Sequence, residues 1–161
     1  EGTYPLPEAQ LDRFMFNVLL DYPSYEQEVM IVKNTTADDI QKVEKVLSAD
    51  EIIAFQHLVR RVPIADNVVE YAVKLSHLTR PGVNGSATAN EFLEWGAGPR
   101  ASQFLVLGAK CNALLQGKYS PDIEDVQAIA KPVLRHRIVR NFKAEAEGIT
   151  IDGIIEKLIE A

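Results

Sequence analysis

One arginine, Arg100, is placed where a guanidinium group could meet a phosphate. It directly follows Pro99, in the first turn of a helix predicted over residues 99–116. A cation there faces the positive end of the helix dipole, which typically costs about 0.3–1 kcal/mol, and four backbone N–H groups point outward without helical partners. Such a broken local rule often marks a functional position, and the arrangement suits an anion such as phosphate. The alternative is that Arg100 bends outward and pairs with Glu94 or Glu91.

A second arginine, Arg13, lies between a short acidic segment and an apolar one. We predict a short helix over residues 7–13 and a strand over residues 14–20, and these two elements would hold the Arg13 guanidinium in a fixed place. A planar, permanently charged guanidinium matches the oxygens of a phosphoryl group in transfer. The alternative is an ordinary surface arginine whose charge is screened by Glu8 and Asp12.

The sequence carries no complete catalytic motif of its own. A phosphate-binding loop of the pattern GxxxxGK[ST] is missing, because Tyr119 follows the only Gly-Lys pair, Gly117-Lys118. The three histidines show no metal-ligand spacing, and the single Cys111 excludes an internal disulfide. The sequence therefore predicts neither a metal site nor a self-contained catalytic centre.

The charge pattern argues against a nucleic-acid-binding protein. The net charge is -6 and the isoelectric point about 5.1, so a global electrostatic grip on a phosphate backbone is not expected. The basic stretch 131–143 is a local exception that could touch nucleic acid or an acidic partner. The alternative is a solvated helix face balanced by Glu145, Glu147 and Asp152.

Hydropathy and cysteine content suggest where the protein works. No window approaches the roughly 18 uninterrupted apolar residues that a membrane span needs. A single cysteine fits a reducing compartment. We therefore expect a cytoplasmic protein without a membrane span.

The elements that would position the two arginines are mostly helices. The strand over 14–20 is nearly all apolar and should be buried on both faces, as in a parallel sheet, yet the chain offers it no partner strands. We predict helices that begin at Ser24, Ser48, Asp66, Pro99, Ser120-Pro121 and Thr150, a kink or end at Pro132, a polar linker over 34–47, and a long loop over 80–98 that Trp95 anchors on the bundle.

The helix that begins at Ser48 has the clearest amphipathic pattern. Ser48 and Glu51 form a capping box, and Pro63 should stop the helix. Its apolar positions recur at helical spacing and predict a buried stripe. The stripe consists of Ile52, Ile53, Phe55, Leu58, Val59 and Val62.

Three stretches resemble the MoxR-type AAA+ ATPases. Residues 1–14, EGTYPLPEAQLDRF, resemble the segment that follows the family's sensor 1 strand. Residues 95–102, WGAGPRAS, are similar to its sensor 2 motif, and residues 133–138, VLRHRI, resemble its late lid signature. The chain is thereby identified as a C-terminal part of such an ATPase. The implied fold is mostly α: a one-strand stub of the αβα ATPase core followed by a helical lid.

The resemblance implies a role for each arginine. Arg13 would be the catalytic arginine finger, which reaches the ATP of a neighbouring subunit. Arg100 would be the nucleotide-binding sensor 2 arginine, which reads the γ-phosphate of its own subunit or of a neighbour. The implied boundaries are residues 1–33 for the end of the core, 34–62 for a linker and connecting helix, and 63–161 for the lid.

The resemblance also implies cofactors and partners. ATP and Mg²⁺ would be bound mainly by parts that this sequence lacks, so the chain alone should not hydrolyse ATP. The expected partners are neighbouring subunits in a homo-oligomeric ring, a hexamer, and client proteins or von Willebrand factor A domain proteins that a chaperone-like ATPase remodels.

Two other classes of function remain open at this point. The chain could be a stand-alone helical adaptor that binds partner proteins, or a helical domain that binds nucleic acid through residues 131–143. An adaptor should be complete in itself, whereas a part of an ATPase should leave the strand over 14–20 unpaired.

Overall fold

The computed structural model describes residues 6–38 and 43–161, and most of them are helical. In that part of the chain one small antiparallel sheet joins two short strands. The elements in chain order are α1 (Glu8–Leu11), α2 (Tyr25–Thr36), α3 (Ala49–Arg61), α4 (Asp66–Leu78), α5 (Ala87–Phe92), β1 (Leu93–Trp95), α6 (Pro99–Leu115), α7 (Ile123–Leu134), β2 (Val139–Arg140), α8 (Phe142–Ala146) and α9 (Ile151–Ile159).

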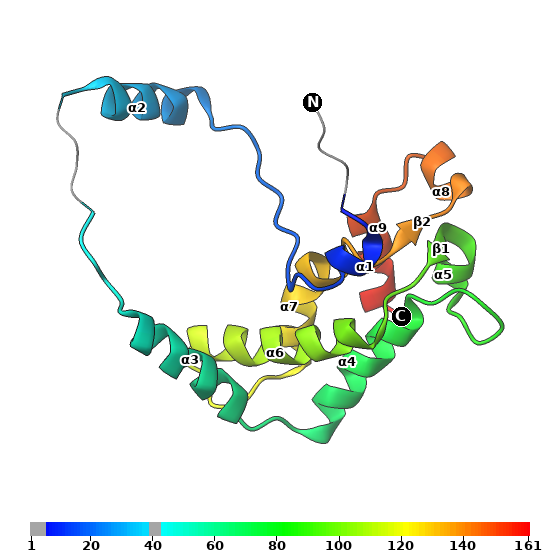
Figure 1. The fold of residues 1–161 in the computed structure, drawn as a ribbon. Coiled ribbons are helices and arrows are strands. Elements are labelled where there is room, and N and C mark those ends of the chain that lie inside the picture. Colours follow the sequence, from blue (N-terminus) through cyan, green and yellow to red (C-terminus); the bar gives the residue numbers. More distant parts are fainter. Residues whose placement is uncertain (1–5, 39–42) are drawn as a thin grey trace.

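The core lies where α6 and α7 cross, with α4 and α9 packed around them (Figure 1). Leu105 of α6, Leu134 of α7 and Leu75 of α4 are fully buried there, and each such side chain contributes about 1.5–3 kcal/mol of transfer free energy. Gly108 lets α6 approach α7 closely, because a Cβ at this position would lie 3.1 Å from Ile129 Cδ1. The mostly α fold predicted from the sequence is confirmed.

The two-stranded sheet lies partly inside the segment that we predicted to be one long loop. Residues 80–98 contain α5 and β1, and β1 pairs with β2 so that Leu93 lies opposite Arg140. Trp95 is 60% exposed and does not anchor this segment on the bundle, so that prediction is wrong. Phe92, at the end of α5, and Leu93, at the start of β1, are buried in the core instead.

The predicted strand over residues 14–20 is not a strand in this structure. These residues are extended but pair with no other strand among the residues described, and most of their apolar side chains are exposed. The segment leads away from α1 to α2, which Figure 1 shows apart from the other helices. The predicted burial on both faces is therefore wrong for this chain, since burial needs neighbouring strands that these residues do not find.

Most predicted helix starts are confirmed, because capping is a local interaction. Ser24 and Ser48 each form a capping box, with Gln27 and Glu51, and Thr150 caps α9. Two predicted starts are displaced. The N-cap of α4 is Ala65 rather than Asp66, and the N-cap of α7 is Asp122 rather than Ser120, while Pro132 lies inside α7, two residues before its end.

The apolar stripe predicted to be buried on α3 is largely exposed. Ile52, Ile53, Phe55 and Leu58 each keep a large part of their surface in solvent, and only Val62, just past the helix, is buried. Within the described residues α3 packs mainly on α6. The amphipathic pattern predicted the helix correctly, but residues 6–38 and 43–161 do not supply a surface that covers its apolar face.

A buried carboxylate, Asp125, joins the start of α7 to the end of α6. Its oxygens accept hydrogen bonds from Asn112 Nδ2 (2.8 Å), Lys118 Nζ (3.0 Å) and the Asp122 backbone N–H (2.8 Å). Burial by itself raises the pKa of Asp125, but these hydrogen bonds and the Lys118 charge outweigh it and lower the pKa below the ordinary 3.8. A lowered pKa means that the folded state favours the charged form, so Asp125 stabilises the fold at neutral pH and less so in acid.

We expect Asp125→Asn to destabilise the chain by about 1–3 kcal/mol at a pH of about 6, because three donors lose a charged acceptor. The difference from wild type should narrow as the pH falls below about 3.8, where the unfolded state takes up its proton first. Urea unfolding at about pH 6 and about pH 3 measures this. The exposed Glu124→Gln is the control, and a difference that stays constant over this range would contradict the assignment.

Candidate functional site

The most heavily bonded side chain near the candidate arginines is that of Arg137, which follows the end of α7. Its side chain is 1% exposed. Nε donates to Asp12 Oδ1 (3.0 Å), and Nη2 donates to the carbonyls of Asp12 (2.8 Å) and Phe14 (2.5 Å). Nη1 donates to the carbonyls of Met15 (3.3 Å) and Val133. All five N–H groups of the guanidinium therefore have acceptors, which is the full capacity of an arginine.

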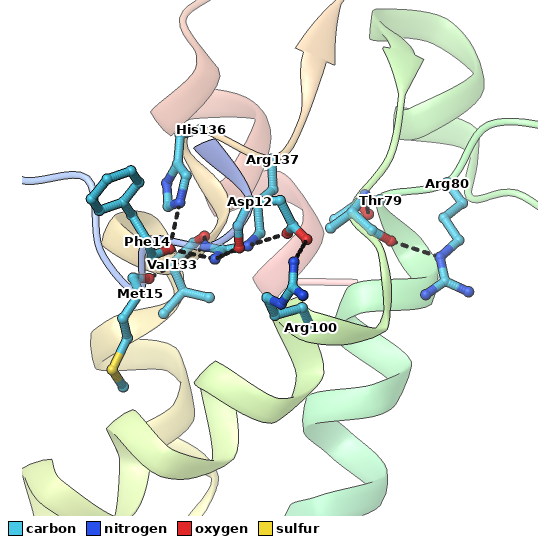
Figure 2. Close-up of polar contacts among 10 residues, drawn as sticks. Asp12, Phe14, Met15, Thr79, Arg80, Arg100, Val133, His136 and Arg137 are labelled. Carbon is cyan, nitrogen blue, oxygen red and sulfur yellow. Dashed lines mark hydrogen bonds and ion pairs between the residues drawn. The ribbon is translucent and has the colours of Figure 1, made fainter. Parts of the chain in front are cut away.

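These contacts fasten residues 12–17, here called the strap, onto the end of α7 (Figure 2). His136 Nε2 lies 2.9 Å from the Phe14 carbonyl. Arg135 donates to the Asn17 carbonyl (2.8 Å), and the Asn17 N–H donates to the Pro132 carbonyl (2.8 Å). The strap is thus held by hydrogen bonds from side chains and backbone of the helix end, rather than by a sheet.

The hydrogen bond of His136 depends on its protonation state. Burial lowers the pKa of His136, and the nearby Arg137 charge acts in the same direction. The ring is therefore neutral near pH 7, with the Nε2 proton donated to Phe14. Nδ1 is buried and has no partner in the described structure, which agrees with a neutral ring, because a charged one would leave a buried N–H unsatisfied.

Asp12 is shared by two arginines that come from different parts of the lid. Its Oδ2 accepts from Arg100 Nη1 (2.6 Å) and its Oδ1 accepts from Arg137 Nε (3.0 Å). The Arg100 side chain is 43% exposed and the Asp12 side chain 31%. Arg100 therefore does pair with a carboxylate, but the partner is Asp12. The pairing with Glu94 or Glu91 that the sequence left open does not occur.

Arg13 follows directly after Asp12 and its side chain is exposed. Its backbone N–H donates to the Gln10 carbonyl (3.1 Å). Across residues 6–38 and 43–161 its guanidinium makes no ion pair and no side-chain hydrogen bond, so neither Glu8 nor Asp12 pairs with it. Arg13 is thus the sequence neighbour of the carboxylate that binds Arg100.

The loop that carries Arg100 is pinned to the end of α4. Thr79, which is buried, accepts the Ala97 N–H with its hydroxyl (2.8 Å), and Arg80 Nε donates to the Ala97 carbonyl (2.9 Å), as Figure 2 shows for Thr79 and Arg80. Gly96 permits this contact, because a Cβ there would lie 2.5 Å from the Thr79 carbonyl oxygen and from Arg80 Cα. The start of α6, and with it Arg100, has a fixed position relative to α4.

The basic stretch 131–143 is neutralised within the chain. Each of its lysines and arginines pairs with an acid, and Arg135 forms a bidentate pair with Asp152 (2.7 and 2.8 Å). That pair lowers the pKa of Asp152 and raises the pKa of Arg135. The other pairs are Lys131–Glu156, Arg137–Asp12, Arg140–Glu145, Lys143–Glu91 and Lys143–Glu147. Glu145, Glu147 and Asp152 thus balance the stretch, as the alternative to nucleic-acid binding predicted. Arg137 differs from that prediction, because it is buried rather than solvated.

The described residues hold no cluster of three or more histidine, cysteine or acidic side chains that could bind a metal ion. Among those same residues, none of the helices combines the length and the hydropathy needed to cross a bilayer. The guanidinium groups of Arg13 and Arg100 suit a phosphate, but the described residues around them do not fit a Mg²⁺ ion.

Sequence reasoning selected Arg13 and Arg100 as candidates but missed the ion pairs that Asp12 makes with Arg100 and Arg137. Arg137 entered only as part of a basic stretch, and Asp12 only as a screening charge. A usable signal was present, because Arg137 lies between the apolar residues Val133-Leu134 and Ile138, all of which are buried. A charged residue within an apolar run must either leave the core or find partners there.

Comparison with known proteins agrees with this arrangement. Residues 86–158 match the AAA lid domain family. The chain is 32% identical to the chaperone MoxR1 of Mycobacterium tuberculosis over 99% of its length, and 33% identical to the uncharacterized protein YeaC of Bacillus subtilis over all of it. A crystal structure of a candidate ATPase from Cytophaga hutchinsonii covers 99% of the chain with a TM-score of 0.89 at 33% identity.

The chain spans about half the length of the proteins it matches: 42% of MoxR1, 48% of YeaC and 49% of the Cytophaga chain. The matching region includes the lid family over α5 to α9 as well as the strap and α1 to α4, which precede it. The chain therefore belongs to the MoxR-type AAA+ ATPases, as the C-terminal part that contains their helical lid.

Proposed function

We propose that this chain supplies two phosphate-reading arginines to a MoxR-type AAA+ ATPase, Arg13 as the arginine finger and Arg100 as the sensor 2 arginine. The proposal for Arg13 rests on the difference between its backbone and its side chain within the strap. The backbone around Arg13 is clamped to the lid, while its own guanidinium is exposed and has no partner in the described residues. A guanidinium held in this way suits transition-state charge on a phosphoryl group, because little reorganisation is needed when it binds.

The position of Arg100 supports a shared pocket. Arg100 reaches Asp12, the neighbour of Arg13 in sequence, at 2.6 Å. Arg100, which binds Asp12, and Arg13, which follows Asp12 in sequence, are suited to bind the same polyanion. If Arg13 reaches the ATP of a neighbouring subunit, we propose that Arg100 reads that same ATP.

In the intact protein we place these residues at the contact between subunits of a homo-oligomeric ring, a hexamer. ATP and Mg²⁺ would be held by the phosphate-binding loop and acids outside this chain, so the chain alone would not turn over ATP. The two arginines would then link the nucleotide state to the position of the lid. The relative named chaperone MoxR1 supports client proteins as partners, and von Willebrand factor A domain proteins are our candidates among them.

The two other classes of function are less well supported. A self-contained adaptor does not account for the unpaired, exposed residues 14–20 or for the uncovered apolar face of α3. A nucleic-acid-binding domain would need free cations in residues 131–143, and its lysines and arginines are paired with acids.

A subunit-mixing experiment tests the finger and the direction in which each arginine acts. One subunit carries Arg13→Ala with an intact ATP pocket, and the other carries Arg13 but lacks its own phosphate-binding lysine. Each should be nearly inactive alone, and the mixture should recover turnover, because one interface then combines an intact pocket with an intact finger. The same experiment with Arg100→Ala in place of Arg13→Ala should also recover turnover if both arginines act on the neighbour.

Mixed rings that form but stay as inactive as the separate proteins would refute a finger that acts between subunits. Recovery of turnover in the mixture with Arg13→Ala, but not in the mixture with Arg100→Ala, would instead assign Arg100 to the ATP of its own subunit. Mixed-ring formation is checked by co-purification of differently tagged subunits.

A further inference from the structure

We propose that Arg137 is a positioning residue for the finger, and that it acts by fixing the backbone on both sides of Arg13. This inference rests on the proposed role of Arg13 and adds to it a specific residue of the lid. Arg137 lies 122 to 125 residues away from the strap residues that it contacts, so the lid rather than the local chain would determine where the finger points.

The first argument is the pattern of hydrogen bonds. Arg137 donates to the carbonyls of Asp12 (2.8 Å), Phe14 (2.5 Å) and Met15 (3.3 Å). The contacted carbonyls thus flank Arg13 without including its own. A clamp on both flanks fixes the direction of the Cα–Cβ bond of Arg13 and leaves the guanidinium free to bind, as Figure 2 shows for the clamp itself.

The second argument is that an arginine is a poor choice here if stability alone matters. Burying a guanidinium loses its hydration, and buried ion pairs can often be replaced by apolar side chains without loss of stability. Burial lowers the pKa of Arg137 and Asp12 opposes this shift, so the group is desolvated but stays charged. Phe104, whose ring centroid lies 4.9 Å from the guanidinium carbon, holds it from another side. Such a group fixes geometry, because its donors need acceptors in defined directions.

The third argument is that the same group also fixes Asp12. One carboxylate oxygen is held by the buried Arg137 and the other is left for Arg100, whose side chain is far more exposed. Asp12 is therefore a fixed acceptor for Arg100. Both phosphate-reading arginines depend in this way on one buried guanidinium.

The test is Arg137→Lys in the intact ATPase, because lysine keeps the charge but has three donors on one nitrogen instead of a planar fork of five. We expect kcat to fall roughly ten- to hundredfold, as a misplaced catalytic group does, with KM for ATP little changed. The matched control is Arg135→Lys. Arg135 lies on the same helix end, pairs with an acid and holds the same strap, but it contacts Asn17, beyond the residues that flank the finger. Its kcat should stay within about threefold of wild type.

A double-mutant cycle separates positioning from general support of the fold. If Arg137 acts mainly through Arg13, then adding Arg137→Lys to Arg13→Ala should lower the residual turnover much less than Arg137→Lys lowers wild-type turnover, because only the path through Asp12 to Arg100 remains. A second drop of similar size would overturn the inference, as would unchanged kcat in Arg137→Lys or an equal loss in Arg135→Lys. Full turnover in Arg13→Ala alone would instead refute the proposed function on which the inference rests.

Because Arg137 is buried, Arg137→Lys could fail to fold, and a second variant then carries the test. Asp12→Ala removes the shared carboxylate at the surface and leaves the apolar core untouched. It should lower kcat by roughly tenfold, and by clearly less in the Arg13→Ala background, where only its contact with Arg100 remains to be lost. If Arg137→Lys does not fold and Asp12→Ala retains wild-type kcat, the inference is wrong.

Discussion

Replacing Arg13 by alanine in the intact ATPase is expected to lower ATP hydrolysis by roughly 10³–10⁵ while ATP binding stays nearly unchanged. This range corresponds to about 4–7 kcal/mol of the barrier. The reason is that a finger meets charge that develops only in the transition state, so its loss affects kcat rather than the binding of ATP. The exposed position of Arg13 indicates that its removal costs little folding energy, because its side chain makes no hydrogen bond or ion pair within the described residues.

The measurement is steady-state turnover together with the Kd for ATP. Arg61→Ala, which removes another exposed arginine at the end of α3, should leave turnover within about threefold and controls for net charge. Arg13→Lys should remain strongly impaired, because an ammonium group cannot replace a planar fork. The finger assignment is rejected if Arg13→Ala keeps turnover within about threefold of wild type, since fingers contribute far more than that.

The parts of the fold that the sequence predicted well are those decided within a few residues. The capping boxes at Ser24 and Ser48 and the cap at Thr150 need only the residue itself and one three positions later. The start of α6 follows from Pro99 in the same way. Each of these interactions is complete inside one turn of helix, so the tertiary structure has little opportunity to override it.

The wrong predictions concern surfaces whose partners lie elsewhere. Residues 14–20 have the composition of a buried strand and α3 has an apolar stripe, but neither pattern states which surface will cover it. The two displaced starts have a different cause. At α7 the Asp122 backbone N–H donates to the Asp125 carboxylate across the first turn. This capping interaction moves the start of the helix past Ser120-Pro121.

The candidate site shows the same limit. Arg13 and Arg100 could be selected from the sequence, because each occupies an unusual local position and each falls in a motif of the resembled family. The meeting of Arg100 and Arg137 at Asp12 could not be predicted, since 88 residues separate Asp12 from Arg100 and 125 separate it from Arg137. Contacts over such separations depend on how the helices pack, which no local pattern of residue types reveals. The roles of Arg13 and Arg100 stay predictions until the turnover experiments are done.

Replacing Gly96 by alanine should have the largest effect on stability among single-methyl changes in the loop before Arg100. The new Cβ would lie 2.5 Å from Arg80 Cα and from the Thr79 carbonyl oxygen, and 2.7 Å from the Thr79 carbonyl carbon. All three are backbone atoms, so the two segments must move apart. The hydrogen bonds of Ala97 with Thr79 and Arg80 are then lost together. Overpacking and the loss of the acceptor of the Ala97 N–H together should cost about 2–4 kcal/mol.

Gly98→Ala is the matched control, because it adds the same methyl group two residues later in the same loop. Its Cβ would meet nothing within 4 Å, and its φ of -78° and ψ of 179° suit any residue. We expect its stability to stay within about 1 kcal/mol of wild type, since a weaker helix cap is offset by a less flexible unfolded chain. Urea unfolding of the two variants measures the difference. Equal midpoints would contradict the close packing of Gly96 on the end of α4, and with it the fixed position of the helix start from which Arg100 reaches Asp12.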